Sequence, residues 1–167
     1  VMLSGETAVG AFPIEAVVAM AGVIRGAEAS PYWRGPTDYN LTCDAVDESV
    51  ALAAMTVAEN LSGVAAVVCL TSTGRTAQLM SRTRARIPIY AVGDRDQTLA
   101  RVALYRGVYP VRFETAALHA DQVNQAALDE LRRAGIVDKG DRVIVCRGDY
   151  HNAVTAGTNT VEVLTVS

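Results

Sequence analysis

Residues 63–92 have the sequence GVAAVVCLTSTGRTAQLMSRTRARIPIYAV, and this stretch decides the fold. It opens with a continuous apolar run, Val64–Leu70, which is too short for a lone helix and is typical of a strand buried on both faces. A polar loop, a short helical pattern over residues 77–86 and a second apolar run over 87–92 follow directly. This order predicts part of a parallel α/β sheet, with the loop at the carboxyl edge, where such sheets bind ligands.

The loop Thr71-Ser72-Thr73-Gly74-Arg75-Thr76 has the composition of an oxyanion site. Its hydroxyls can donate hydrogen bonds, its glycine allows close approach of the backbone, and its arginine can form a forked contact with a phosphate. Free backbone N–H groups at the start of the next helix also attract an anion. An ordinary helix N-cap with solvated hydroxyls explains the same residues, so the loop by itself leaves both interpretations open. It is not a P-loop, because GxxxxGK[ST] is absent.

The rest of the chain alternates between helical and extended patterns. Helices are expected over residues 13–30, 44–61, 96–105 and 118–131, and Asp96 is the expected N-cap of the third of these. Further strands are expected over residues 1–3, 108–113, 142–146 and 161–166. Pro110 implies that its strand lies at an edge of the sheet. These patterns predict the α/β class: a three-layer α/β/α sandwich around a five-stranded mixed sheet, mostly parallel, with an antiparallel C-terminal hairpin.

Composition sets the broad class. The chain has 167 residues, of which half are hydrophobic and a fifth charged, so a sizeable core is available. A net charge of −3 and a pI near 5.3 argue against a dedicated nucleic-acid binder. The three cysteines form no CxxC pattern, and Cys69 and Cys146 lie in apolar runs, so both are expected to be buried in a protein of the reducing cytoplasm. No apolar run reaches the roughly 18 residues of a membrane span.

The first 30 residues resemble a piece of a larger unit. Residues 1–3 have the pattern of a strand end, and the helix from Pro13 carries an apolar stripe that one strand end and one helix cannot bury. The start lacks the basic region of a signal peptide and also lacks an initiator methionine, so a fragment of a longer protein is expected. Residues 31–40, with two prolines and a glycine, are the best candidate for a linker; the alternative is that the aromatic residues Tyr32 and Trp33 pack on a neighbouring surface.

Two other groups of polar residues are candidates for a catalytic or metal-binding site. Ser4, Glu6 and Thr7 are close enough in sequence to suggest a nucleophile with an acid, or else a turn held by side-chain hydrogen bonds; the elbow motif G-x-S-x-G is absent. His119 and His151 are not at metal-ligand spacing, so both are expected at the surface and no metal site is expected.

Residues 148–160, GDYHNAVTAGTNT, form a long polar segment between two predicted strands. A loop of this length without its own secondary structure is often functional, and here it is placed to close over the 71–76 loop as a lid. A solvated hairpin loop is the alternative. The candidate lid residues are Gly148, Asp149, His151, Ala156, Gly157 and Thr158.

Several motifs, in the order of the chain, resemble those of the pyruvate kinase family. They are VMLSGETAVGAFPIEAV, LTSTGRTAQLMSRTRARIPIYAV, LYRGVYPV, KGDRVIV and GTNTVEVLTV, and the resemblance extends over essentially all 167 residues. It implies that residues 1–30 are the last strand end and helix of a catalytic (β/α)₈ barrel. Residues 31–40 would then be the linker, and residues 41–167 the C-terminal regulatory domain.

The resemblance also implies the activity of the parent enzyme, which transfers a phosphoryl group from phosphoenolpyruvate to ADP in glycolysis with Mg²⁺ and K⁺. The metal ligands and main catalytic residues would lie upstream, so this chain alone is expected to be inactive and to bind no cofactor itself. Ser4 would lie near the active site and would at most support the groups that touch the substrate, without touching the substrate itself. The parent protein would be a homotetramer without a nucleic-acid or membrane partner.

By the same resemblance, Thr71 to Thr76 would hold the phosphate of an allosteric effector, and the 148–158 loop would cover it. Family members that bind fructose 1,6-bisphosphate commonly have a lysine at the second loop position, where this chain has Ser72, and use a basic residue that this chain lacks between Arg112 and Arg132. Fewer cations favour a sugar monophosphate or AMP, as in bacterial isoforms of that type. A stand-alone phosphate-binding module and an oligomerisation domain with a vestigial loop are the alternatives.

Overall fold

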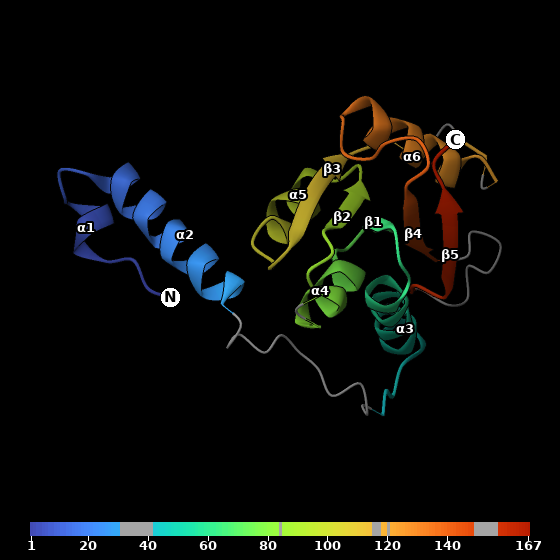
Figure 1. Ribbon diagram of the computed structural model, residues 1–167, viewed down its shortest axis with the longest axis horizontal. Helices are drawn as coiled ribbons and strands as arrows, with labels where there is room; N and C mark the ends of the chain where they lie inside the picture. The colour runs from blue at the N-terminus through green and yellow to red at the C-terminus, as the bar shows by residue number, and fades with distance from the viewer. Residues whose placement is uncertain (31–41, 84, 115–117, 120, 149–156) are drawn as a thin grey trace. The chain divides into compact units, whose positions relative to one another are not determined.

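The computed structural model describes residues 1–30, 42–83, 85–114, 118–119, 121–148 and 157–167, so the predicted linker lies outside the described residues. The chain forms two compact units, Val1–Gly35 and Pro36–Ser167 (Figure 1). The boundary between them falls within the predicted linker. The assignment of residues 1–30 to a barrel stays a prediction.

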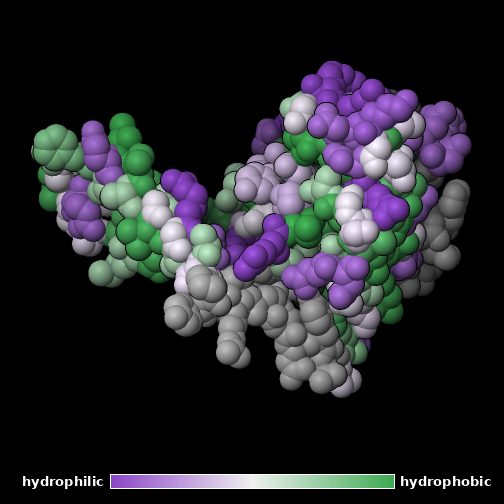
Figure 2. All heavy atoms as spheres, viewed as in Figure 1, coloured by the Kyte–Doolittle hydropathy of each residue, from purple (hydrophilic) through white to green (hydrophobic). Residues whose placement is uncertain are grey.

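The first unit consists of two helices, α1 (Gly5–Ala8) and α2 (Pro13–Ala29). Pro13 occupies the first turn of α2, where its missing N–H costs nothing. Neither helix buries a side chain, and Val17 and Val18 on α2 are 48% and 61% exposed. Hydrophobic residues are accordingly visible on the surface of this unit (Figure 2). Its described residues form no hydrophobic core of their own.

The strand end predicted at residues 1–3 is wrong for this structure. These residues have no regular secondary structure, and α1 replaces the expected loop. Extended backbone needs a neighbouring strand to satisfy its polar groups, and the described part of this unit contains none. The N–H groups of Thr7 and Ala8 instead donate to the carbonyl of Ser4, at 3.2 and 3.0 Å.

The second unit is built on a five-stranded sheet with the order β3-β2-β1-β4-β5. The strands are β1 (Val64–Leu70), β2 (Ile89–Gly93), β3 (Val108–Arg112), β4 (Arg142–Arg147) and β5 (Thr160–Thr165). The first four strands are parallel, whereas β4 and β5 pair antiparallel. The predicted mixed sheet with a C-terminal hairpin is therefore confirmed, and Pro110 lies in edge strand β3 as expected.

Helices cover both faces of this sheet (Figure 1). One face packs against α3 (Val46–Asn60), α4 (Arg75–Arg82) and α5 (Asp96–Val102), and the other against α6 (Val123–Arg133). Successive side chains of β1 alternate between the two cores, with Val67 in the first and Val68 in the second. Burial of β1 on both faces, as its apolar run predicts, makes the domain a three-layer sandwich.

Two helix boundaries differ from those expected. The helix predicted from residue 118 begins at Val123, because Leu118 packs against the second core before the helical turns start. The helix predicted over 96–105 ends at Val102, and Asp96 is its first residue rather than its N-cap. The Asp96 carboxylate forms an ion pair with Arg112 instead of capping the helix. A tertiary contact therefore replaces the local one.

The buried cysteines give a test of this core. Cys69 and Cys146 are paired in register on β1 and β4 and fully buried, and burial raises the pKa of both thiols, that of Cys146 to about 12. Cys43 is only partly buried. We expect a thiol reagent at pH 8 to modify Cys43 in the native chain, and Cys69 and Cys146 only after unfolding, as measured by mass spectrometry. Rapid native labelling of Cys69 would contradict this packing.

Candidate functional site

The 71–76 loop connects β1 to α4 at the carboxyl edge of the sheet. Gly74 is the N-cap of α4 and has a left-handed φ of +82°. Its N–H donates to Thr71 Oγ1 at 2.9 Å, and the N–H of Arg75 donates to Thr73 Oγ1 at 3.4 Å. A Cβ on Gly74 would lie 2.7 Å from Val102 Cγ1 of α5. Backbone conformation and space therefore both require glycine at this position.

The loop's hydroxyls divide into two groups. Thr76 is buried, and its Oγ1 shares a hydrogen bond with Oγ1 of Thr158, which is buried as well. Ser72 and Thr73 are exposed, and the Ser72 carbonyl accepts a hydrogen bond of 2.8 Å from Thr98 Oγ1 on α5. The loop is thus held from both sides, while the hydroxyls of Ser72 and Thr73 face solvent.

The contact between Thr76 and Thr158 brings together two segments that the sequence analysis proposed separately. The ends of the predicted lid also meet, since a Cβ on Gly148 would lie 2.8 Å from the carbonyl oxygen of Gly157. Asp149, His151 and Ala156 lie outside the described residues. The described ends of the predicted lid therefore lie beside the loop that it was expected to cover.

Arg75 has carboxylate partners. Its guanidinium forms ion pairs with Asp47 and, at 3.3 Å, with Glu48, both in the first turn of α3. The hydrogen bond from Arg75 is the main cause that lowers the pKa of the Asp47 carboxyl. The sequence assigned Arg75 to a phosphate and did not indicate these partners, which lie more than 25 residues earlier. In this structure, much of the positive charge of the loop is balanced.

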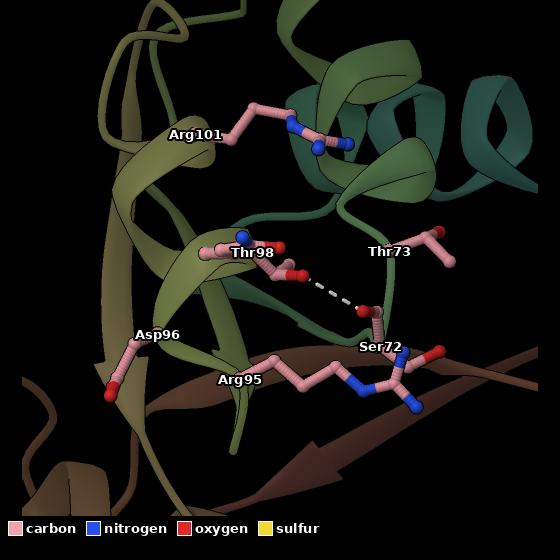
Figure 3. A pocket seen from close by; sticks show the side chains of 7 residues that line it. Ser72, Thr73, Arg95, Asp96, Thr98 and Arg101 are labelled. Atoms are coloured by element: carbon pink, nitrogen blue, oxygen red, sulfur yellow. Dashed lines mark hydrogen bonds between the residues drawn. The ribbon is translucent and has the colours of Figure 1, made fainter.

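A cavity of about 460 Å³ lies on the opposite side of the loop, against α5 (Figure 3). It is lined by Ser72, Thr73, Arg95, Asp96, Gln97, Thr98 and Arg101. The residues from α5 were not among the predicted site residues. The signal that indicates them is topological: the segment after β2 emerges at the same sheet edge as the loop after β1, because the two strands are parallel neighbours.

Comparison with known proteins assigns this arrangement to a family. The family model described as "Pyruvate kinase, alpha/beta domain" matches residues 48–164, which include all of the sheet but the last residue of β5, and the 71–76 loop. The chain belongs to the pyruvate kinase family.

Individual pyruvate kinases also match the chain outside residues 48–164. Pyruvate kinase II of Salmonella typhimurium is 42% identical over 167 residues, which is 99% of this chain and 34% of the relative. The pyruvate kinase of Haemophilus influenzae is 42% identical over 151 residues, which is 89% of this chain and 31% of the relative. Human pyruvate kinase PKLR is 36% identical over 181 residues, which is 100% of this chain and 30% of the relative. The chain thus spans about a third of the length of these relatives.

The remaining candidates of the sequence analysis do not form a second site in the described residues. Ser4 Oγ donates to Glu6 Oε2 at 3.0 Å, and Thr7 Oγ1 donates to the Ser4 carbonyl at 3.1 Å, so the interpretation as a hydrogen-bonded turn is confirmed. His119 is exposed, as predicted, whereas His151 is not described. Among the described residues, no helix has the length and apolar content needed to cross a membrane.

The fit of Gly74 against α5 can be tested by substitution. We expect Gly74→Ala to lower the free energy of unfolding by roughly 2–4 kcal/mol, because it combines a strained φ with a clash against Val102. Gly63→Ala is the matched control: Gly63 has a φ of +75° and open space around it, so only about 1–2 kcal/mol should be lost. Urea denaturation measures both values. Equal losses would contradict the tight contact with α5.

The ion pair of Arg75 predicts a pH dependence. Because the pKa of Asp47 is lower in the folded chain than in the unfolded one, the pair stabilises the fold above about pH 3.9, and this contribution disappears as the pH falls through the folded value. We expect carbon NMR to show Asp47 titrating below its ordinary range in the native chain and closer to it in Arg75→Gln. Arg82→Gln, at the other end of α4, is the control and should leave the titration unchanged.

Proposed function

We propose that this chain is the regulatory part of a pyruvate kinase and that it binds a phosphorylated effector at the 71–76 loop. The observation that carries the proposal is the contact between Thr76 and Thr158, because it joins the loop to the segment expected to close over a ligand. Exposed hydroxyls on Ser72 and Thr73 are available as hydrogen-bond donors beside it. A phosphate bound there would contact α4 at its N-terminus, where free N–H groups favour an anion.

The balance of charge supports one phosphate rather than two. Ser72 stands where family members that bind a bisphosphate commonly have lysine, and Arg75 already contacts two carboxylates. An effector phosphate would have to share Arg75 with Asp47 and Glu48, or displace them. We therefore favour a sugar monophosphate or AMP over fructose 1,6-bisphosphate.

The proposal extends to the whole protein. Its activity would be phosphoryl transfer from phosphoenolpyruvate to ADP in the cytoplasm, with Mg²⁺ and K⁺ bound by parts of the protein beyond this chain. The described residues contain no cluster of three or more His, Cys, Asp or Glu side chains that fits a metal. The Ser4 hydroxyl donates its hydrogen bond locally, to the Glu6 carboxylate. This chain by itself is expected to lack catalytic activity.

Regulation would act on how subunits pack in a homotetramer. A ligand that orders the 148–158 segment shifts the balance between two arrangements only by its difference in affinity for them. The stand-alone alternative is disfavoured, because matches to full-length pyruvate kinases continue through the first 30 residues. The vestigial-loop alternative is favoured by one observation, the carboxylates that already balance the charge of Arg75.

The experiment is calorimetry of this chain with ribose 5-phosphate, glucose 6-phosphate, AMP and fructose 1,6-bisphosphate. We expect a monophosphate to bind, and Arg75→Gln to weaken that binding at least about tenfold through loss of a charge-assisted hydrogen bond. Arg82→Gln removes the same charge from the far end of α4 and should leave the affinity unchanged.

Two outcomes would contradict this proposal. Preferential binding of the bisphosphate would reject the proposed ligand class while keeping the site. No binding of any of the four compounds would favour the oligomerisation domain with a vestigial loop.

A further inference from the structure

We propose that the cavity between the 71–76 loop and α5 is a second anion-binding site, which takes the phosphoryl group of a small phosphate ester. This site shares Ser72 and Thr73 with the proposed effector site, but its charge comes from α5 and not from Arg75, and it does not need the contact of Thr76 with Thr158. Its ligand groups come from the loop and from residues 95–101. It would exist even if the predicted lid had no function.

Two arginines provide the charge of the cavity. Figure 3 shows the guanidinium groups of Arg95 and Arg101 on either side of Thr98, that of Arg95 extending toward Ser72 and that of Arg101 toward the helix that follows the loop. The one carboxylate in the lining, that of Asp96, points away from the loop and forms an ion pair with Arg112. The cavity therefore presents two positive charges, and its single negative charge is balanced elsewhere.

Neither arginine has a side-chain partner among the described residues. Arg75, Arg112 and Arg133 each form an ion pair with a carboxylate. Arg95 and Arg101 form no such pair and no side-chain hydrogen bond within the described ranges, although both border a hollow of the surface. Guanidinium groups without counter-ions among the described residues attract an anion, and their planar donors match the oxygens of a phosphate.

The neutral groups of the lining also act as donors. The Thr73 hydroxyl accepts a hydrogen bond from the N–H of Arg75, so its own hydrogen is free to be donated. The hydroxyl of Ser72 is exposed at the cavity, and Gln97 contributes an amide NH₂. Thr98, by contrast, donates its hydrogen to the Ser72 carbonyl and so fixes the loop against α5. An excess of donors favours a ligand with several acceptor oxygens.

The size of the cavity indicates more than a free phosphate ion. Its volume of about 460 Å³ lies within the range of roughly 300–1,000 Å³ that is usual for small-molecule sites. The loop and α5 that form the cavity are also held together, because the Thr98 hydroxyl donates a hydrogen bond of 2.8 Å to the Ser72 carbonyl. A phosphate ester, with its phosphoryl group between the arginines, fits this combination of charge and volume.

The test is an NMR titration of ¹⁵N-labelled chain with inorganic phosphate, ribose 5-phosphate and fructose 1,6-bisphosphate in turn. We expect the amide signals of residues 95–101 to shift together with those of the shared residues 72–73, with the esters binding more tightly than inorganic phosphate. The double variant Arg95→Gln/Arg101→Gln should weaken this binding at least tenfold. Arg82→Gln/Arg86→Gln removes the same total charge from exposed positions outside the cavity and should leave it unchanged.

Thermal unfolding of both double variants checks that they remain folded. Equal weakening in the two variants would overturn the site, because general electrostatic attraction would then explain the binding. Shifts confined to residues 74–76 and 157–158, or no shifts with any probe, would overturn it as well.

Arg75→Gln separates the two sites. This variant should leave the shifts at residues 95–101 intact, whether or not it weakens binding at the effector site. Equal affinity for all three probes would retain a phosphoryl site and overturn its assignment to an ester.

Discussion

The structure depends on the burial of β1 on both faces, which is complete over its last five residues. This strand is central, pairs in parallel with β2 and β4, and has no charged side chain that could face water. Burial on both faces requires helices on both sides, and parallel pairing requires that each connection cross the sheet. Polar residues are thereby confined to the ends of the strands. The described residues that directly follow β1, β2 and β4 lie at one edge as a consequence.

Charge is distributed unevenly at that edge. Arg75 lies in the loop itself but contacts Asp47 and Glu48, whereas Arg95 and Arg101 lie on a different segment and have no carboxylate partner in the described part of the chain. An anion approaching the loop therefore meets balanced charge on the side of α3 and free charge on the side of α5. Which cations are available is decided by helix packing rather than by their distance along the sequence.

The family assignment gives this edge a biological context. The matched domain covers nearly all of the sheet and its helices, and the relatives are about three times longer than the chain. The first 30 residues match those relatives too, yet they bury no side chain of α1 or α2 in their own unit. An apolar helix of this kind needs a partner surface, as the proposed barrel would provide.

The sequence by itself determined the layer architecture and most elements of the second unit, although not α1 or the ends of two helices. Short β-branched apolar runs such as Val64–Leu70 are typical of buried strands, and Gly74 and Pro110 occupy positions that their backbones favour. It also indicated the 71–76 loop and the segment that ends at Thr158. Only the tertiary structure decided that Thr76 meets Thr158, that Arg75 pairs with α3, and that Arg95 and Arg101 border a cavity. Local periodicity reflects which face of an element is buried, whereas contacts between residues far apart depend on how the elements pack.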